Sequence, residues 1–174
     1  MLVLNGLCRS HMEHYHRLRT ALQALLDKAS PIVLTMTSAV VGEGKTLMSL
    51  NFCLAAASAG LKTLLIETDS ERRCLRRILG ISPSPGLSEV LSGDIHWRQC
   101  LRGKTDIMKG AFPLDDLRRD FQIIVFDCPP VLLFGEVMFM GRNSDGVVLN
   151  DISLRDLEAE YGYPSYYYGR PGGG

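Results

Sequence analysis

Apolar residues fall in short blocks along this chain, separated by glycine, proline and charged residues. From Met12 to Lys28 they recur at helical spacing, which predicts an amphipathic helix. The run PIVLTMT, residues 31–37, is rich in apolar and β-branched residues and predicts a buried strand. A glycine-containing turn follows, then an apolar helix over 46–60 and a second buried strand over 62–69. Strand, glycine-rich loop, helix and strand in this order predict a βαβ unit with parallel strands.

The second half of the chain continues this alternation with a weaker pattern. Its predicted elements are short helices at 71–79 and 87–93, a helical turn at 114–120, and strands at 121–127 and 145–150. Residues 94–110 have no clear periodicity, and no element is predicted there. The fold class expected from the whole pattern is α/β, with a mostly parallel sheet flanked by helices.

Composition narrows the class of protein. The chain has 174 residues, of which 46% are hydrophobic, enough for one domain with a buried core. Nineteen Lys and Arg balance nineteen Asp and Glu, so no nucleic-acid partner is expected. Five dispersed cysteines without a CxxC pair indicate a reducing compartment. The longest apolar stretch has ten residues and no export signal is evident at the start, so we expect a cytoplasmic location.

The loop SAVVGEGKT lies between a predicted strand and a predicted helix. A glycine-rich loop at a helix N-terminus directs backbone N–H groups and the helix dipole at a bound anion. Gly42 and Gly44 permit the close approach, Lys45 would reach the terminal phosphates, and the Thr46 hydroxyl would bind magnesium. Ala39 stands where the usual pattern has its first glycine. The alternative is a plain glycine turn with a solvated lysine.

Three acidic residues are expected at the same edge of the sheet as this loop. Glu67 and Asp69 end the second strand two residues apart, which predicts that both face the same way. Asp127 ends the strand IIVFD. Carboxylates converging near a triphosphate suit magnesium binding and hydroxyl activation. Taken singly, each acid could equally be a solvated strand end or a helix cap.

Together these segments resemble the bacterial tyrosine kinases of capsule and exopolysaccharide synthesis, which are P-loop proteins. The matches run from about Glu13 to Tyr168. In order they are the assembly-helix segment EHYHRLRTAL, the Walker A segment TSAVVGEGKT, the acidic segment LLIETD, the segment GLSEVLSGD, the Walker B strand FQIIVFDCPPV, and a terminal tyrosine cluster.

The resemblance implies a P-loop NTPase-like fold and an ATP- and Mg²⁺-dependent tyrosine kinase that autophosphorylates its tail. It implies catalytic roles for Lys45, Glu67 and Asp69, with Glu67 as the base, and magnesium binding by Thr46, Asp69 and Asp127. The nucleotide-binding residues would be Val41, Gly42, Glu43, Gly44, Lys45, Thr46 and Leu47, and the phosphoacceptors Tyr161, Tyr163, Tyr166, Tyr167 and Tyr168.

The resemblance also implies partners. Glu13 and Arg19 would pack neighbouring copies of the chain into an oligomer, in which one copy's tail reaches another copy's site. A transmembrane activator of the polysaccharide export system would recruit the protein to the inner face of the membrane. The expected organisation is an N-terminal helix over 1–29, a kinase domain over 30–157 and a flexible tyrosine-rich tail over 158–174.

The chain departs from the family's pattern at several points. His16 stands where the assembly helix expects an Arg, and Glu67 replaces the first Asp of the acidic segment. The chain is also short before Leu114 and around 146–150, where a strand, a helix and a strand are compressed into DGVVLN.

Two alternatives to a kinase stay open at the level of sequence. The first is a partition-type ATPase, although Val40 stands where those proteins carry a second lysine. The second is a catalytically degenerate module that binds nucleotide, or nothing, and acts through its tail. Phosphotyrosine formation in the presence of magnesium and ATP would separate a kinase from both.

Overall fold

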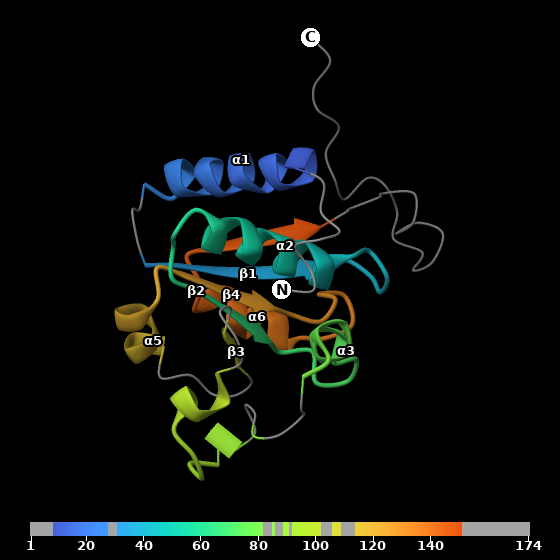
Figure 1. Cartoon of the computed structure of the whole chain (residues 1–174). Coiled ribbons are helices and arrows are strands. Elements are labelled where there is room, and N and C mark those ends of the chain that lie inside the picture. Colours follow the sequence, from blue (N-terminus) through green and yellow to red (C-terminus); the bar gives the residue numbers. More distant parts are fainter. Residues whose placement is uncertain are drawn as a thin grey trace.

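A computed structural model describes residues 9–27, 31–81, 85, 89–90, 92–101, 106–108 and 114–150. In this part of the chain five strands form one parallel sheet in the order β3-β2-β4-β1-β5 (Figure 1). The strands are β1 (Ile32–Ser38), β2 (Thr63–Glu67), β3 (Asp106–Met108), β4 (Ile123–Asp127) and β5 (Gly146–Asn150). The expected parallel α/β fold is therefore confirmed.

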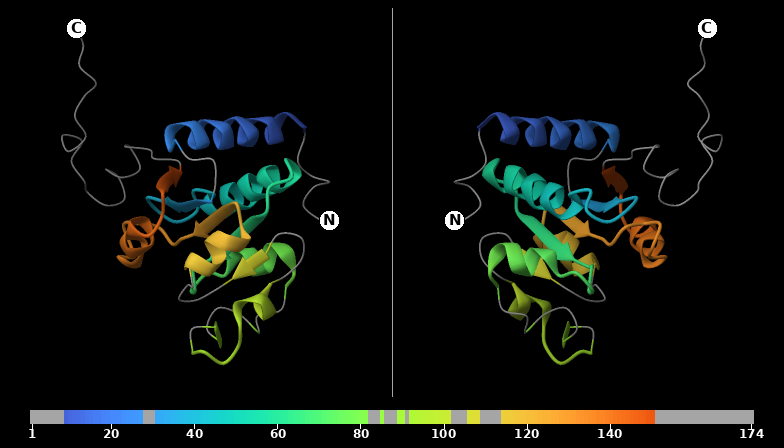
Figure 2. Two further views of the ribbon diagram at one scale, coloured as in Figure 1. Left: turned by 90° about the vertical axis from the view of Figure 1, so that its left-hand side faces the viewer. Right: turned by 90° about the vertical axis from the view of Figure 1, so that its right-hand side faces the viewer.

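Helices cover both faces of the sheet, as Figures 1 and 2 show. The helices are α1 (Arg9–Leu25), α2 (Lys45–Ser58), α3 (Cys74–Leu79), α5 (Leu114–Asp120) and α6 (Glu136–Arg142), with a 3₁₀ helix η1 (Trp97–Cys100). On one face Leu34 and Met36 of β1 pack with α2 and with the inner side of α1. On the other face Val33 packs with Leu117 of α5 and Val137 of α6. Neighbouring residues of β1 thus serve two separate cores.

Burial explains why the inner strands are apolar without interruption. Every residue of β1, β2 and β4 is buried, because each of these strands has a strand on both sides and helices on both faces. The strand β5 lies at the edge of the sheet, and its residues alternate between half-buried and exposed. The sequence pattern therefore separates central strands from the edge strand.

Some elements differ from those predicted. The first helix begins at Arg9 and ends at Leu25 rather than spanning 12–28. Neither β3, in the region without periodicity, nor α6 was predicted. The α6 residues EVMFMGR form two turns that are apolar nearly throughout, so no helical period is visible. Of the helix predicted at 87–93, Glu89 and Val90 are helical and most of the rest lies outside the described residues.

Candidate nucleotide-binding and catalytic site

The glycine-rich loop joins β1 to α2 and contains two left-handed residues. Gly42 has φ 91° and Gly44 has φ 82°, in the region that residues with a side chain rarely adopt. A Cβ on Gly42 would meet no atom within 4 Å, so backbone conformation rather than space requires glycine there. Gly44 immediately precedes the first helical residue, Lys45. The predicted anion-binding geometry, a glycine loop at a helix N-terminus, is present.

Polar contacts hold this loop in shape. The Ser38 hydroxyl donates to the Val40 carbonyl oxygen at 2.7 Å, and the Val40 N–H donates to Glu43 Oε2 at 3.1 Å. From the end of β5, the strand that neighbours β1, Asn150 Nδ2 donates to the Glu43 carbonyl oxygen at 2.5 Å. The side chain of Glu43 thus turns into its own loop, and the end of β5 supports the loop from outside.

Lys45 is buried and forms an ion pair with Asp69. Its Nζ lies 3.0 Å from Asp69 Oδ2, and both side chains are almost fully covered. The other oxygen, Asp69 Oδ1, accepts from the Arg72 N–H at 3.1 Å. The predicted approach of the loop lysine to an acid at the end of β2 is therefore present. A phosphate would have to compete with Asp69 for the ammonium group.

Asp127 is the most deeply buried acid of the site. It has no exposed surface, and its Oδ1 accepts from the Ser49 hydroxyl at 3.2 Å. Its Oδ2 has no hydrogen-bond partner within the described part of the chain. Burial raises the pKa of Asp127 from 3.8 to about 6, an effect that Lys45 and the nearby Thr46 and Ser49 hydroxyls oppose. The arrangement leaves one carboxylate oxygen in need of a donor or a cation.

Glu67 lies beside Asp127 and is bound by the segment that leads into α3. The two strand ends are in register, Glu67 opposite Asp127, and Glu67 is only 2% exposed. Its Oε1 accepts from the Leu75 N–H at 2.8 Å, near the start of α3. The strand ends at Glu67, and both carboxylates accept from backbone N–H groups of the segment that follows, Glu67 from Leu75 and Asp69 from Arg72.

Magnesium fits the residues that converge here. Thr46, buried at the start of α2, and the unpartnered Oδ2 of Asp127 offer oxygen ligands. No cluster of three or more metal-binding side chains occurs among the described residues. Mg²⁺ in nucleotide sites is commonly held by one or two protein oxygens together with phosphates and water.

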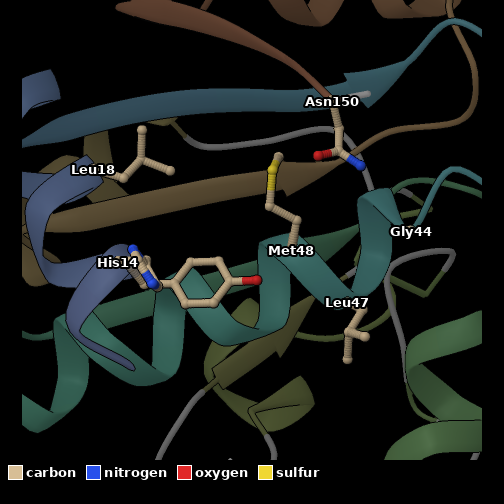
Figure 3. Close-up of a pocket in the computed structure, with 7 residues that line it drawn as sticks. His14, Leu18, Gly44, Leu47, Met48 and Asn150 are labelled. Carbon is tan, nitrogen blue, oxygen red and sulfur yellow. The ribbon is translucent and has the colours of Figure 1, made fainter. Parts of the chain in front are cut away.

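A pocket of about 360 Å³ lies next to the loop (Figure 3). Its lining residues are His14, Tyr15 and Leu18 of α1, Gly44, Leu47 and Met48 around the start of α2, and Asn150. In Figure 3 the amide nitrogen of Asn150 lies on the side of Gly44 and its oxygen on the side of Met48. The pocket is mainly apolar, with an amide at one end.

The site includes residues that the sequence analysis missed. Ser49 lies one helical turn after Lys45, a spacing that places it on the same side of α2, so its contact with Asp127 was open to prediction. Asn150 is the polar end of a predicted strand and reaches the same sheet edge as Asp127. Tyr15, whose hydroxyl accepts from Asn51 Nδ2 at 3.4 Å, carried no sequence signal beyond its apolar position on a helix.

The remaining predicted residues lie at the rim of the loop, on the surface of α1 or outside the described residues. Val41 is 38% exposed at the loop tip, and Leu47 lines the pocket. Glu13 is paired with Arg17 on the surface of α1, and Arg19 donates to Gln23 at 2.6 Å. All five predicted phosphoacceptor tyrosines lie in residues 151–174, which are not described.

Comparison with known proteins connects this site to a family. No protein-family model matches the chain. The putative tyrosine-protein kinase EpsB of Ralstonia nicotianae is 26% identical over 159 residues, covering 79% of this chain and 21% of EpsB. The tyrosine-protein kinase CpsD of Streptococcus pneumoniae serotype 4 is 29% identical, covering 84% of this chain and 74% of CpsD. The crystal structure of the VpsO kinase domain matches with a TM-score of 0.68 and 30% identity, over 79% of this chain and 77% of that domain. The chain belongs to the bacterial tyrosine kinase family of capsule and exopolysaccharide synthesis.

The match covers only part of the length of some relatives, and the fold also occurs outside this tyrosine kinase family. The chain spans about a fifth of the length of EpsB, 21%. The fold itself is wider than the family. Cobyrinic acid a,c-diamide synthase of Mycobacterium smegmatis, solved with an ATP analogue and magnesium, matches with a TM-score of 0.57 at 21% identity, over 69% of this chain and 59% of that protein. The P-loop NTPase-like fold is common to all these proteins.

None of the helices in the described residues is both long enough and apolar enough to span a bilayer. All the described cysteines, Cys53, Cys74, Cys100 and Cys128, are free thiols.

Proposed function

We propose that this chain binds ATP with Mg²⁺ at the β1–α2 loop and transfers the γ-phosphoryl group to tyrosine hydroxyls, including those of its own C-terminal cluster. The observation that carries this proposal is the convergence of Lys45, Asp69 and Asp127 on a left-handed glycine loop. Cations and metal-binding oxygens around a phosphate site are what phosphoryl transfer requires, because the reaction needs positioning and charge stabilisation.

The phosphates would bind the loop N–H groups, and the base would enter the adjoining pocket. Gly44 belongs to both the loop and the pocket lining, so one nucleotide spans them. Asn150 uses its Nδ2 on the Glu43 carbonyl, which leaves Oδ1 as an acceptor on the pocket side. A 6-amino group, as in adenine, would donate to that oxygen, whereas the 6-oxo group of guanine would repel it. This contact favours ATP over GTP.

Lys45 would leave Asp69 and contact the terminal phosphates, while Thr46 and Asp127 would hold magnesium. When bound, the ion supplies positive charge that stabilises the developing charge on the phosphate oxygens. Ionisation of Asp127, whose pKa is about 6, is a condition for its role as a ligand.

In the transfer step the tyrosine oxygen forms a bond to the γ-phosphorus as the bond to the bridging oxygen of ADP breaks. The phenolic proton goes to a carboxylate. Both carboxylates are buried and each accepts from a backbone N–H, Glu67 from Leu75 and Asp69 from Arg72, but the second oxygen of Asp69 would lose its ion pair when Lys45 moves to the phosphates. We therefore favour Asp69 as the group that accepts the proton, with Glu67 retained as the alternative base.

The acceptors would be Tyr161, Tyr163, Tyr166, Tyr167 and Tyr168. Each phosphate would add about 1.5 to 2 negative charges, so the tail would change its charge greatly as it is modified. We propose that this change regulates assembly with a transmembrane activator of polysaccharide export, at the cytoplasmic face of the membrane. The names of the relatives support this setting without testing it for this chain.

The test is incubation of the purified protein with magnesium and ATP, followed by mapping of phosphotyrosine. Lys45→Met should abolish phosphorylation, with a loss of at least about 100-fold, because it removes a charge from the transferring group. Lys62→Met is the matched control, since Lys62 is an exposed lysine whose loss should change nothing.

Each other outcome has a distinct meaning. ATP hydrolysis without phosphotyrosine would indicate a partition-type ATPase. Nucleotide binding without hydrolysis, or no binding at all, would indicate a regulatory module. Equal phosphorylation of the Lys45→Met protein and the wild type, with contaminating kinases excluded, would refute the role of Lys45.

A further inference from the structure

Four arginines lie close together where the chain leaves β2 and enters α3. The segment SERRCLRRIL, residues 70–79, contains Arg72, Arg73, Arg76 and Arg77 and one acid, Glu71. Arg72, Arg73 and Arg77 are exposed, and Arg76 is half-buried. We call these four residues the arginine patch. The phosphoryl transfer proposed above gives the patch no role.

The positive charge of the patch is not neutralised by acids of the described residues. None of its four guanidinium groups forms an ion pair in this part of the chain. Arg73 Nε donates to the Ser70 carbonyl oxygen at 2.9 Å, and Arg77 donates to the Cys74 sulfur at 3.3 Å. Three other exposed arginines do pair with carboxylates: Arg17, Arg98 and Arg119. The patch is therefore free to bind an anionic partner.

The turn after β2 joins the patch to the transfer site. The Arg72 N–H donates to Asp69 Oδ1 at 3.1 Å, and the Arg73 N–H donates to the Asp69 carbonyl oxygen at 3.2 Å. Arg73 has φ 47°, a conformation that glycine adopts with less strain, so the turn itself does not call for an arginine. Figure 1 shows α3 at the same end of the sheet as the loop between β1 and α2. A chain that brings a tyrosine to Asp69 therefore comes close to the arginine patch.

The sequence contains an acid-rich segment directly before the tyrosine cluster. Residues 156–160 read DLEAE, with Asp156, Glu158 and Glu160 and no basic residue. These acids stand five, three and one positions before Tyr161, at most about 18 Å away along an extended chain. Carboxylates match guanidinium groups in charge and in hydrogen-bonding geometry. The DLEAE segment and the arginine patch are therefore complementary, and an acceptor tyrosine adjoins the segment.

We propose that the arginine patch binds the DLEAE segment of the acceptor chain and so presents Tyr161 to Asp69. The inference rests on the proposed function and names the surface that binds its acceptor. Arg72 and Arg73, which adjoin Asp69, would meet the end of the segment next to Tyr161. Arg76 and Arg77 would meet the acids farther from the tyrosine.

This contact should be weak and sensitive to salt. Exposed ion pairs contribute little singly and are screened by dissolved ions, so several of them have to act together. Low affinity suits a substrate that has to leave after transfer. The patch would orient the acceptor, while recruitment of the acceptor would still depend on copies being held near each other.

The experiment measures, by fluorescence anisotropy and without nucleotide, the binding of a labelled peptide of residues 151–174. The receptor is the full chain with Asp156→Asn, Glu158→Gln and Glu160→Gln, so that its own segment does not compete. The peptide should bind at low salt and dissociate as salt is raised. Adding Arg73→Glu with Arg77→Glu to the receptor should weaken binding at least about tenfold, because like charges would then meet.

The matched control is a receptor with Lys62→Glu and Arg142→Glu instead. It carries the same change of charge at two exposed residues outside the patch, and it should bind the peptide normally. No step of the assay uses ATP or Lys45. A chain without kinase activity would therefore leave the binding result unchanged, and loss of the proposed function can be told apart from loss of this inference.

Charge reversal on both sides provides the decisive result. A peptide with Glu158→Lys and Glu160→Lys should bind the Arg73→Glu, Arg77→Glu receptor more tightly than the unaltered patch. Such binding also shows that the altered receptor is folded. A lysine peptide without this preference would overturn the proposal, and so would equal binding of the wild-type peptide by the patch and control receptors.

Absence of peptide binding at low salt would overturn the proposal as well. Binding of phosphatidylserine vesicles through the same arginines would in that case identify the patch as a membrane-binding surface instead.

Discussion

At the scale of the single residue, Asp127 shows how a group suited to the site lowers the free energy of unfolding near neutral pH. Its carboxylate is fully buried, and one oxygen lacks a partner among the described residues. Burial raises its pKa from 3.8 to about 6. Because the folded pKa lies above the unfolded value, Asp127 favours the folded state fully below about pH 4, and this contribution is lost as the pH rises through about 6. A structural role would not require such a residue, whereas a cation would use it.

The variant Asp127→Asn tests this cost. At pH 7 to 8 and without magnesium, its free energy of unfolding should exceed that of the wild type by up to about 3 kcal/mol, since one pKa unit corresponds to about 1.36 kcal/mol. It should therefore unfold at a higher urea concentration. The gain should shrink toward pH 4, where the wild-type carboxyl is neutral. The same variant should lose magnesium-dependent nucleotide binding. Urea titrations at a series of pH values measure the first effect, and a gain that does not change with pH would contradict the assignment.

The sequence predicted those residues of the site whose role depends on local chemistry. Gly42, Gly44 and Lys45 lie in one loop, and their spacing together with the predicted strand before and helix after the loop indicates a phosphate site. Asp127 and Asp69 were predicted from their place at strand ends. The hydrogen bond from the Leu75 N–H to Glu67 was not predictable, because it depends on where α3 begins relative to the end of β2. The backbone partner of Glu67 carries no side-chain signal in the sequence.

At the scale of the element, β5 does more than extend the sheet. Its last residue, Asn150, donates to the Glu43 carbonyl oxygen of the phosphate loop, 107 residues away in sequence. The strand also pairs with β1, which leads into the same loop. Edge strand and loop therefore form one unit, and a change at the end of β5 should reach the phosphates.

The variant Asn150→Ala should weaken ATP binding by about two- to twelvefold, the range that loss of one hydrogen bond of about 0.5–1.5 kcal/mol gives. It should also reduce the preference for ATP over GTP. The control is Asn143→Ala, since Asn143 likewise donates its side-chain amide to a backbone oxygen, that of Phe139, but far from the loop. Calorimetric titration with both nucleotides gives the answer. Equal ATP affinity of Asn150→Ala and the wild type would refute the link.

Elements were predictable where burial imposes a pattern. The central strands β1, β2 and β4 are buried at every position, so they read as uninterrupted apolar runs. The three-residue strand β3 is too short for any pattern. Helix α6 packs Val137 into the core while Met138 and Phe139 are exposed, so apolar residues occur on both of its sides. Its period is lost for that reason.

At the scale of the whole molecule, the placement of the tail relative to the site decides how a tyrosine is presented. Asn150 lines the pocket proposed for the base, and Tyr168 lies 18 positions further along the chain, a distance of at most about 65 Å when extended. The acceptor oxygen must approach the γ-phosphate opposite the departing ADP, on the side of Lys45 and Asp69 rather than of the base. We expect that the tail of a neighbouring copy would reach that side without having to turn back around its own nucleotide.

Transfer between copies is therefore the expected route. Full-length Lys45→Met protein, which cannot label itself, should become phosphorylated when mixed with an active copy lacking residues 159–174. If the first helix packs neighbouring copies, Arg19→Ala in both proteins should lower this transfer several-fold. Holding copies together raises the local concentration of acceptor without any tail-binding pocket. Accumulated phosphate charge would then loosen the assembly and limit the reaction. Mass spectrometry of the Lys45→Met chain measures the outcome. An unmodified Lys45→Met chain, together with wild-type labelling at a rate independent of concentration, would show that each tail reaches its own site.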